Sequence, residues 1–346
     1  MKFLDKVGLE RGALLFGFVL LACVAPFVSS ESHAGHIALL AAVNIVAAVG
    51  LNLINGHTGQ FSLGHAGFMA AGAYASAVIT QKFGPAAGES CGTACAQFLF
   101  FGALLAGGAV AALCGFAIGL PSLRLKGDYL AIVTLGFAEI IRVVIENTEV
   151  LGKARGLSGI APLTNAWWVF GAALLAVYAT GALVNSTYGR GFLAVRDDEI
   201  AAGAMGVRTT RCKVTAFVFG AFFAGIAGAL YAHLTQTISP EGFRLDRSID
   251  IVVMVILGGM GNTFGVAFAA VLLTVLPEGM RYIAGFSSLP EPVREFARNR
   301  MLLYAVLLVA MMLLRPQGLF GGRNVFEKIG GGFRAAGRDP YERRGA

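Results

Sequence analysis

Long apolar runs constrain the fold of this chain more than any other feature of its sequence. A membrane-spanning helix needs roughly 20 mostly apolar residues. Runs of this kind occur at 13–28, 36–54, 67–81, 96–120, 129–147, 166–186, 214–235, 249–259 with 262–277, and 301–315. Strands of a transmembrane β-barrel need only about 10 alternating residues. The runs therefore predict an all-α, polytopic membrane protein whose main solvent is the lipid bilayer.

The distribution of charge predicts how the chain is oriented in that bilayer. Only 14% of the residues are charged, against about 25% in soluble domains. The net charge of +7 would suggest nucleic acid in a soluble protein, but here the cations gather in particular loops, and no nucleic-acid partner is expected. Positively charged loops stay in the cytoplasm. Both termini and the loop 187–213 are therefore predicted to be cytoplasmic, which favours about ten spans if 249–277 crosses twice.

The ends of the chain and two cysteines need separate consideration. The cations before the run 13–28 resemble those of a signal peptide, but the many spans that follow favour an uncleaved first helix. We expect a permease domain at 1–320 and a basic, disordered cytoplasmic tail at 321–346. Cys91 and Cys95 fall in a predicted external loop between 81 and 96, where an oxidising compartment would permit a disulfide. The sequence leaves that bond open.

Two glycine-rich stretches, 52–77 and 255–270, interrupt the apolar runs. Each glycine costs a helix up to about 1 kcal/mol relative to alanine, and paired breaks in two halves of a chain indicate a transport pathway. The residues predicted to line that pathway are Thr58, Gly59, Gln60, Ser62, Gly64, His65, Gly258, Gly259 and Gly261. The alternative is that glycines let helices pack closely, and it carries equal weight for Gly67, Gly72 and Gly265. His57 and His65 lie about 80° apart around a helix, so no metal site is expected.

The run 129–147 carries a stripe of charge. Glu139, Arg142 and Glu146 share one helical face, where the arginine can pair with either acid. Ionisable groups at membrane depth usually face the interior of a helix bundle. Glu139 is therefore added to the predicted pathway. Glu146 is instead expected to pair with Arg142 near the membrane interface and to have no further role.

The loop around residue 200 contains a short charged helix. Asp197, Asp198 and Glu199 begin it and three cations follow its end, an order that complements the helix dipole. The helix is too short to span a membrane. Helices that lie on lipid prefer large apolar residues and cations, so its small residues and acidic start favour docking to a protein partner.

These segments together resemble the permeases of branched-chain amino acid ABC importers, of the LivM type. The resemblance rests on "TGQFSLGHAGFMAAGAYA" (58–75), "LRLKGDYLAIVTLGFAEIIRVV" (123–144), "AVRDDEIAAGAMGVRTTRCKVTAFVFGAFFAGIAGALYA" (194–232), "ISPEGF" (238–243), "VILGGMGNTFGVAFAA" (255–270) and "RPQGLFG" (315–321). It implies that the charged helix is the coupling helix that an ATPase grips, through Asp197, Asp198, Glu199, Ala201, Ala202 and Gly206. The importer motif Glu-Ala-Ala-x-x-x-Gly is matched by Ala201, Ala202 and Gly206, while Glu199 is displaced by one residue and the downstream Ile-x-Leu-Pro is absent.

The resemblance also implies a set of partners in the bacterial inner membrane. They are a second, different permease, two cytoplasmic ATPase subunits, and a periplasmic binding protein for Leu, Ile or Val. The chain has no G-x-x-x-x-G-K-[ST] phosphate loop, so we expect it to be neither an enzyme nor a carrier of its own cofactor.

Three alternatives remain at this point. A related importer for urea or short amides shares the architecture. A proton-driven secondary transporter would use Glu139 as its carrier, but the coupling-type loop argues against it. An intramembrane enzyme would need a nucleophile–base pair or a metal pair, and no spacing in the sequence suggests one.

Overall fold

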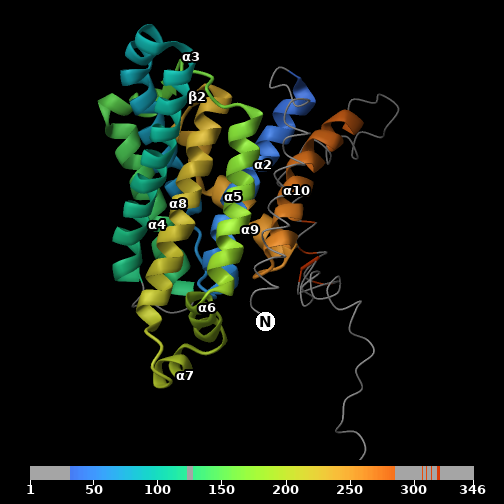
Figure 1. Cartoon of the computed structure of the whole chain (residues 1–346). Helices are drawn as coiled ribbons and strands as arrows, with labels where there is room; N and C mark the ends of the chain where they lie inside the picture. Colours follow the sequence, from blue (N-terminus) through green and yellow to red (C-terminus); the bar gives the residue numbers. More distant parts are fainter. Residues whose placement is uncertain are drawn as a thin grey trace, which may run out of the picture.

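The computed structural model describes residues 32–122 and 128–284, together with 306, 309, 313, 318 and 319; the side chains of 85–94, 121–122, 128 and 282–284 are not described. The described part of the chain is helical almost throughout (Figure 1). Its long helices are α2 (His33–Asn52), α3 (His65–Ser122), α4 (Asp128–Asn147), α5 (Ala166–Asn185), α8 (Thr209–Thr235) and α10 (Thr263–Ala284). Its shorter helices are η2 (Leu53–His57), η3 (Glu149–Leu151), η4 (Lys153–Arg155), α6 (Thr187–Asp197), α7 (Glu199–Ala204), η5 (Pro240–Phe243) and α9 (Leu245–Gly258).

Five of the helical segments are long and apolar enough to cross a membrane: His33–His57, Cys95–Leu120, Ala166–Asn185, Thr209–Thr235 and Thr263–Arg281. The predicted class of polytopic helical membrane protein is therefore confirmed. The number of ten spans stays a prediction, since the run 13–28 and most of 301–315 lie outside the described residues. The tail 321–346 lies outside them as well.

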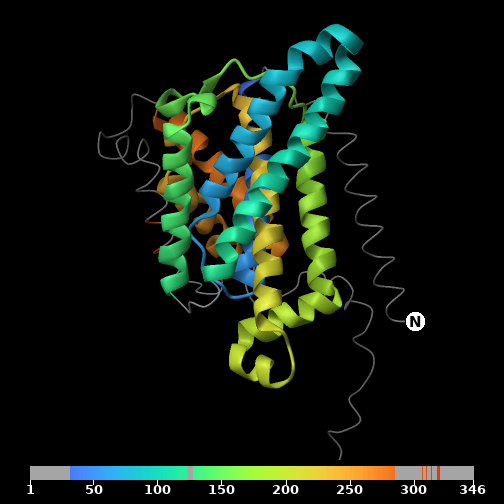
Figure 2. The same ribbon diagram turned by 90° about the vertical axis from the view of Figure 1, so that its left-hand side faces the viewer.

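The helix α3 differs from expectation, because the loop predicted between 81 and 96 is helical. This stretch contains three glycines and Pro85, which disfavour helix, so the local residues favour a loop and the packing of the chain overrides them. The two halves of α3 nevertheless run back along one another: a Cβ on Gly107 would lie 2.7 Å from the carbonyl oxygen of Gly72. Figure 2 shows the reversal at one end of the molecule. The side chain of Cys91 lies outside the described residues, so the structure does not test a Cys91–Cys95 disulfide.

The centre of the bundle is the seam between α3 and α8. Glycines from both helices meet there: a Cβ on Gly72 would overlap the backbone of Gly225, and a Cβ on Gly228 would overlap the carbonyl of Met69. Helices in lipid gain little from the hydrophobic effect, so close backbone packing through small residues holds them together. We call Gly72, Gly107, Gly225 and Gly228 the seam glycines.

The other helices are arranged around this seam. Thirteen of the 20 residues of α2 are buried, so α2 is an inner helix, packed against α8, α10 and α5. In contrast, α4, α5 and α10 expose large apolar side chains such as Ile132, Leu175 and Phe268. Such side chains suit contact with lipid or with another membrane subunit.

The two ends of the bundle differ. One end carries α6 and α7, which hang below the long helices (Figure 1). The other carries a two-residue antiparallel ribbon of β1 (Leu157–Ser158) and β2 (Thr237–Ile238), with Leu157 opposite Ile238 and Ser158 opposite Thr237. The cations counted as cytoplasmic between 187 and 213 therefore lie at the α6–α7 end.

Candidate functional site

The first glycine-rich stretch breaks the helix as predicted. The inner helix ends in the π-helical turn η2, residues 58–64 are non-helical, and α3 begins at His65. Gly59 has φ +67°, which side-chain-bearing residues rarely adopt. The Nε2 atom of His65 lies 2.9 Å from the carbonyl oxygen of Ala47, a residue well inside α2. The chain therefore folds back into the bundle before α3 starts, and we call 56–64 the first break.

Side chains from distant helices satisfy the backbone of the first break. The amide of Leu63 donates to Thr134 Oγ1 of α4 at 3.1 Å, and the amide of Ala66 donates to Ser248 Oγ of α9 at 3.1 Å. Asn55 Oδ1 accepts a bond from the amide of Ser62 at 3.2 Å. Non-helical backbone at membrane depth requires such partners, so this break is a specified part of the fold.

The second glycine-rich stretch also breaks as predicted. The 14-residue helix α9 is about 21 Å long, shorter than the roughly 30 Å hydrocarbon layer. It ends before 259–262, the second break, where Gly259 has φ +98° and Gly261 φ +87°. Asn262 Oδ1 then accepts a bond from the amide of Gly265 in the first turn of α10, at 3.1 Å. The stretch 249–277 thus forms one short and one full-length helix.

Residues far along the chain cover the second break. The amide of Leu319 donates to the carbonyl of Leu257 at 2.8 Å. A Cβ added to Gly318, whose φ is +84°, would overlap the Cα atom of Gly259. Gly318 and Leu319 of the "RPQGLFG" motif therefore lie beside the end of α9.

The two breaks meet at one point. A Cβ on Gly56 would overlap the backbone nitrogen of Gly261, so two backbones touch there. The amide of Gly261 donates to Asn52 Oδ1 at 2.9 Å. Arg196, at the end of α6, donates to the carbonyl of Gly56 at 3.2 Å. Segments that are 205 positions apart in sequence (56 to 261) thus form a single site beside the charged loop.

The polar residues of the first break are buried in this site. Thr58, Gln60, Ser62 and His65 are at most 4% exposed. The Thr58 hydroxyl donates to the carbonyl of Ile54 at 2.7 Å, and Gln60 Nε2 donates to Thr58 Oγ1 at 3.1 Å. Gly64 lies against the carbonyl of Thr134, and Gly258 against the backbone of Val266.

Hydrogen-bonding capacity remains in this cluster. Within the described part of the chain, Gln60 Oε1, Asn52 Nδ2 and both ring nitrogens of His57 are buried with no hydrogen-bond partner. Burying a polar atom without a partner is costly. Buried polar atoms without a partner need an explanation beyond packing, and a functional role at this site is one.

Glu139 is not part of this site. Its side chain is 54% exposed and pairs with Arg142, which also pairs with Glu146. Thr134 is the residue of α4 that bonds to the first break. Sequence reasoning missed Thr134, Ser248, Asn52 and Arg196; the only available signal was that Thr134 and Asn52 are polar residues within apolar runs.

In the charged loop, several residues that were predicted to dock a partner instead stabilise the helix α7 through contacts within this protein. Asp198 Oδ1 caps α7 by accepting bonds from the amides of Ile200 at 2.8 Å and Ala201 at 3.0 Å. Glu199 accepts a bond from the buried Lys213 at 2.6 Å, and Ala202 is buried. These three residues therefore specify the shape of the loop.

Other residues of α7 face outward. Asp197 and Ala201 are exposed, and there is open space around Gly203 and around Gly206, which has φ +84°. Ile200 is 75% and Met205 85% exposed. Large apolar side chains this exposed, grouped on and just after a short helix, indicate an interaction surface; Met205 was not among the residues predicted to dock. We call Ile200, Gly203, Met205 and Gly206 the α7 face.

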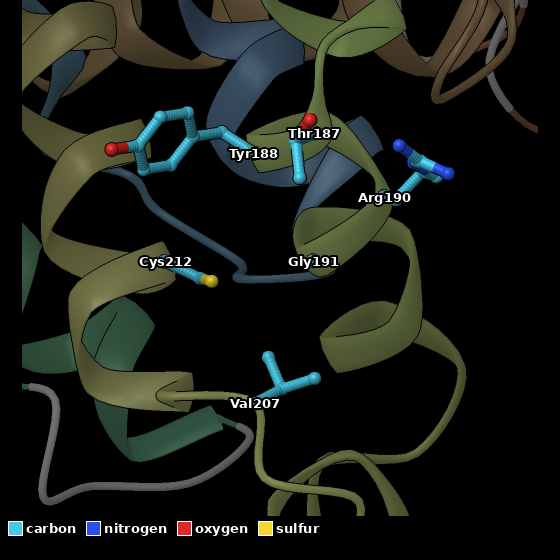
Figure 3. Close-up of a pocket in the computed structure, with 6 residues that line it drawn as sticks. All are labelled: Thr187, Tyr188, Arg190, Gly191, Val207 and Cys212. Atoms are coloured by element: carbon cyan, nitrogen blue, oxygen red, sulfur yellow. The ribbon is translucent and has the colours of Figure 1, made fainter.

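A hollow separates α6 from the first turns of α8 (Figure 3). It is lined by Thr187, Tyr188, Arg190, Gly191, Val207 and Cys212. The α6–α7 loop therefore does not pack tightly on the bundle along its whole length. It is held by the Glu199–Lys213 pair, by the Arg196 bond to Gly56, and by the buried Phe192, which packs with Leu53 and Ala216.

Comparison with known proteins shows the family to which the chain belongs. Residues 34–312 match the family described as branched-chain amino acid transport system / permease component. The high-affinity branched-chain amino acid transport system permease proteins LivM of Salmonella typhimurium and Escherichia coli are each 34% identical over 351 residues, covering 91% of this chain and 76% of theirs. The probable LivM of Methanocaldococcus jannaschii is 30% identical over 233 residues, 61% of this chain and 66% of its own.

No solved structure matches the chain. The family match spans both helix breaks and the charged loop. The chain therefore belongs to the permease component family of branched-chain amino acid transport systems.

Proposed function

We propose that this protein forms half of the membrane pathway by which Leu, Ile and Val enter the cell, driven by ATP hydrolysis in a separate subunit. The observation that carries the proposal is the meeting of two helix breaks inside the bundle, next to the loop that presents α7. A transport pathway needs backbone that can rearrange. A pathway powered by ATP also needs contact with the subunit that hydrolyses ATP. Both features lie at one site here.

The pathway is assigned to the two breaks. The residues assigned to it are Thr58, Gly59, Gln60, Ser62, Gly64, His65, Gly258, Gly259 and Gly261. Broken helices near the midplane are where transporters open to alternate sides. Glu139 lies apart from them as a paired, half-exposed group, which weakens the alternative of a proton carrier on α4.

The partners follow from the same proposal. A second, different permease supplies the other half of the pathway, two ATPase subunits bind in the cytoplasm, and a periplasmic binding protein delivers the substrate. The exposed apolar side chains of α4 and α10 provide surfaces for the second permease and for lipid. The α6–α7 end and both termini are assigned to the cytoplasmic side of the inner membrane.

Uptake by the reconstituted complex tests this proposal. The permease is placed in proteoliposomes with its neighbouring-gene permease, ATPases and binding protein, and radiolabelled leucine uptake is measured with ATP inside. We expect uptake that requires ATP and the binding protein, with competition by isoleucine and valine. Competition by urea or short amides, with none by valine, would replace the proposed substrate. Uptake that requires a proton gradient and no ATP would contradict the proposed driver.

A further inference from the structure

One arginine touches both breaks. Arg196 is the next-to-last residue of α6 and lies two positions before Asp198, the cap of α7. Its Nη1 atom donates to the carbonyl of Gly56 in the first break at 3.2 Å. A Cβ on Gly261 of the second break would lie 3.0 Å from the same nitrogen. The guanidinium therefore sits at the point where the two breaks meet.

The aliphatic part of the Arg196 side chain also packs where only a glycine leaves room. A Cβ on Gly59 would lie 2.9 Å from Cγ of Arg196. Three of the glycines predicted or found at the breaks, Gly56, Gly59 and Gly261, thus leave room for one another or for this side chain. At Gly59 and Gly261, Arg196 of α6 occupies the space that a Cβ would need. This contact favours glycine there as much as the positive φ angles do.

The bond also suits the chemistry of its acceptor. Gly56 lies in the last turn of η2, where carbonyls lack helical partners and carry the negative end of the helix dipole. An arginine offers five donors and stays charged. The neighbouring Asp197 carboxylate lies 3.5 Å from Nε of Arg196, so the guanidinium is held between α6 and the end of the inner helix.

We propose that Arg196 is the positioning residue that transmits movement of α7 to the two breaks. This inference rests on the proposed function, since it requires an ATPase that moves α7. A shift of α7 pulls on Asp198 and the end of α6, and Arg196 then releases or tightens on Gly56 beside Gly261. The contact between the breaks changes as a result, and the pathway opens or closes.

Removing the side chain tests the link. In the reconstituted complex, Arg196→Ala is compared with Arg196→Lys and with Arg190→Ala, a matched cation on α6 whose side chain makes no hydrogen bond or ion pair to any described residue. We expect Arg196→Ala to lower leucine uptake at least tenfold while ATPase recovery and melting temperature stay unchanged. ATP hydrolysis continues, so the ATP spent per leucine rises at least tenfold. Lysine retains a cation but not the planar fork and should restore part of the uptake, and Arg190→Ala should behave as the unmodified protein.

A second readout does not depend on the transported substrate. With the native cysteines replaced by serine, Met260→Cys places an exposed thiol next to Gly261. We expect its labelling rate with a maleimide to change between the nucleotide-free and the vanadate-trapped complex, and Arg196→Ala to abolish that change. This readout works even if the substrate is not leucine, so it separates failure of the link from failure of the proposed function.

Two results would overturn the link. One is an Arg196→Ala complex whose leucine uptake and Met260→Cys labelling both stay within twofold of the unmodified values. The other is an equal loss of uptake, ATPase recovery and melting temperature, which would make Arg196 an ordinary structural residue of the loop.

Discussion

Glycine serves opposite purposes in two regions of this molecule. In the seam between α3 and α8, Gly72, Gly225 and Gly228 are helical and let backbones touch. At the breaks, Gly59, Gly259 and Gly261 have positive φ and end helices instead of joining them. The seam is apolar and has no freedom to move without losing its packing. The breaks are surrounded by polar side chains whose bonds can be exchanged, so they suit a part that moves.

The largest expected effect is in the seam. Gly228→Leu would drive a side chain into the carbonyl of Met69, and overpacking of this kind costs about 1–3 kcal/mol or more. We expect little folded protein, measured by size-exclusion chromatography of detergent extracts. Gly102→Leu, in α3 but with open space around the added side chain, is the control. Normal recovery of Gly228→Leu would mean that the seam does not hold the bundle together.

The next effect is at the breaks. In Gly59→Leu or Gly261→Leu the backbone must hold a left-handed conformation that costs a side-chain-bearing residue about 1–2 kcal/mol, and the new side chain displaces Arg196. We expect uptake to be abolished while membrane insertion stays largely intact. Uptake close to normal in both variants would reduce these glycines to packing residues and remove the pathway assignment.

A third change leaves both glycine regions untouched. Gly203 is helical and has open space around it, so Gly203→Trp alters the α7 face alone. We expect a correctly inserted permease, no ATPase in a pull-down, and no uptake. Asp198→Lys with Glu199→Lys should weaken ATPase binding too, in part because the α7 cap and the bond to Lys213 are lost. A lipid-bound α7 predicts the reverse, since each added lysine strengthens attachment to anionic lipid by about 1 kcal/mol. Full ATPase recovery with normal uptake would contradict a coupling role.

The smallest effect is expected at Glu139. It lies outside the breaks, and exposed ion pairs contribute only about 0–1 kcal/mol. We expect Glu139→Gln to change leucine uptake less than threefold in the proteoliposome assay. A loss as large as that of Gly59→Leu would place α4 in the pathway after all.

Part of this architecture follows from the sequence alone. Apolar runs predict the helices because a segment in lipid must be apolar and must satisfy its own backbone hydrogen bonds. Polar neighbours distinguish a break from a packing site: Gly59 lies between Thr58 and Gln60, whereas Gly72 lies between two alanines. The runs 67–81 and 96–120 predict the reversal within α3, but not that its connection is helical. The meeting of Gly56 with Gly261 could not be predicted, since it depends on how α2, α6 and α9 pack. For the same reason nothing in the sequence distinguishes Arg196 from its neighbouring cations.

The central claim is that the breaks move while the seam stays fixed. Spin labels report on the breaks when placed at Phe61 and Met260, the exposed non-glycine positions of the two breaks. Labels report on the seam when placed at Leu105 of α3 and Phe219 of α8, which are also exposed. Distances are measured by double electron–electron resonance in the nucleotide-free and vanadate-trapped complexes. We predict that the Phe61–Met260 distance distribution shifts and that the Leu105–Phe219 distribution does not. An unchanged Phe61–Met260 distribution in a complex that transports leucine would contradict the account.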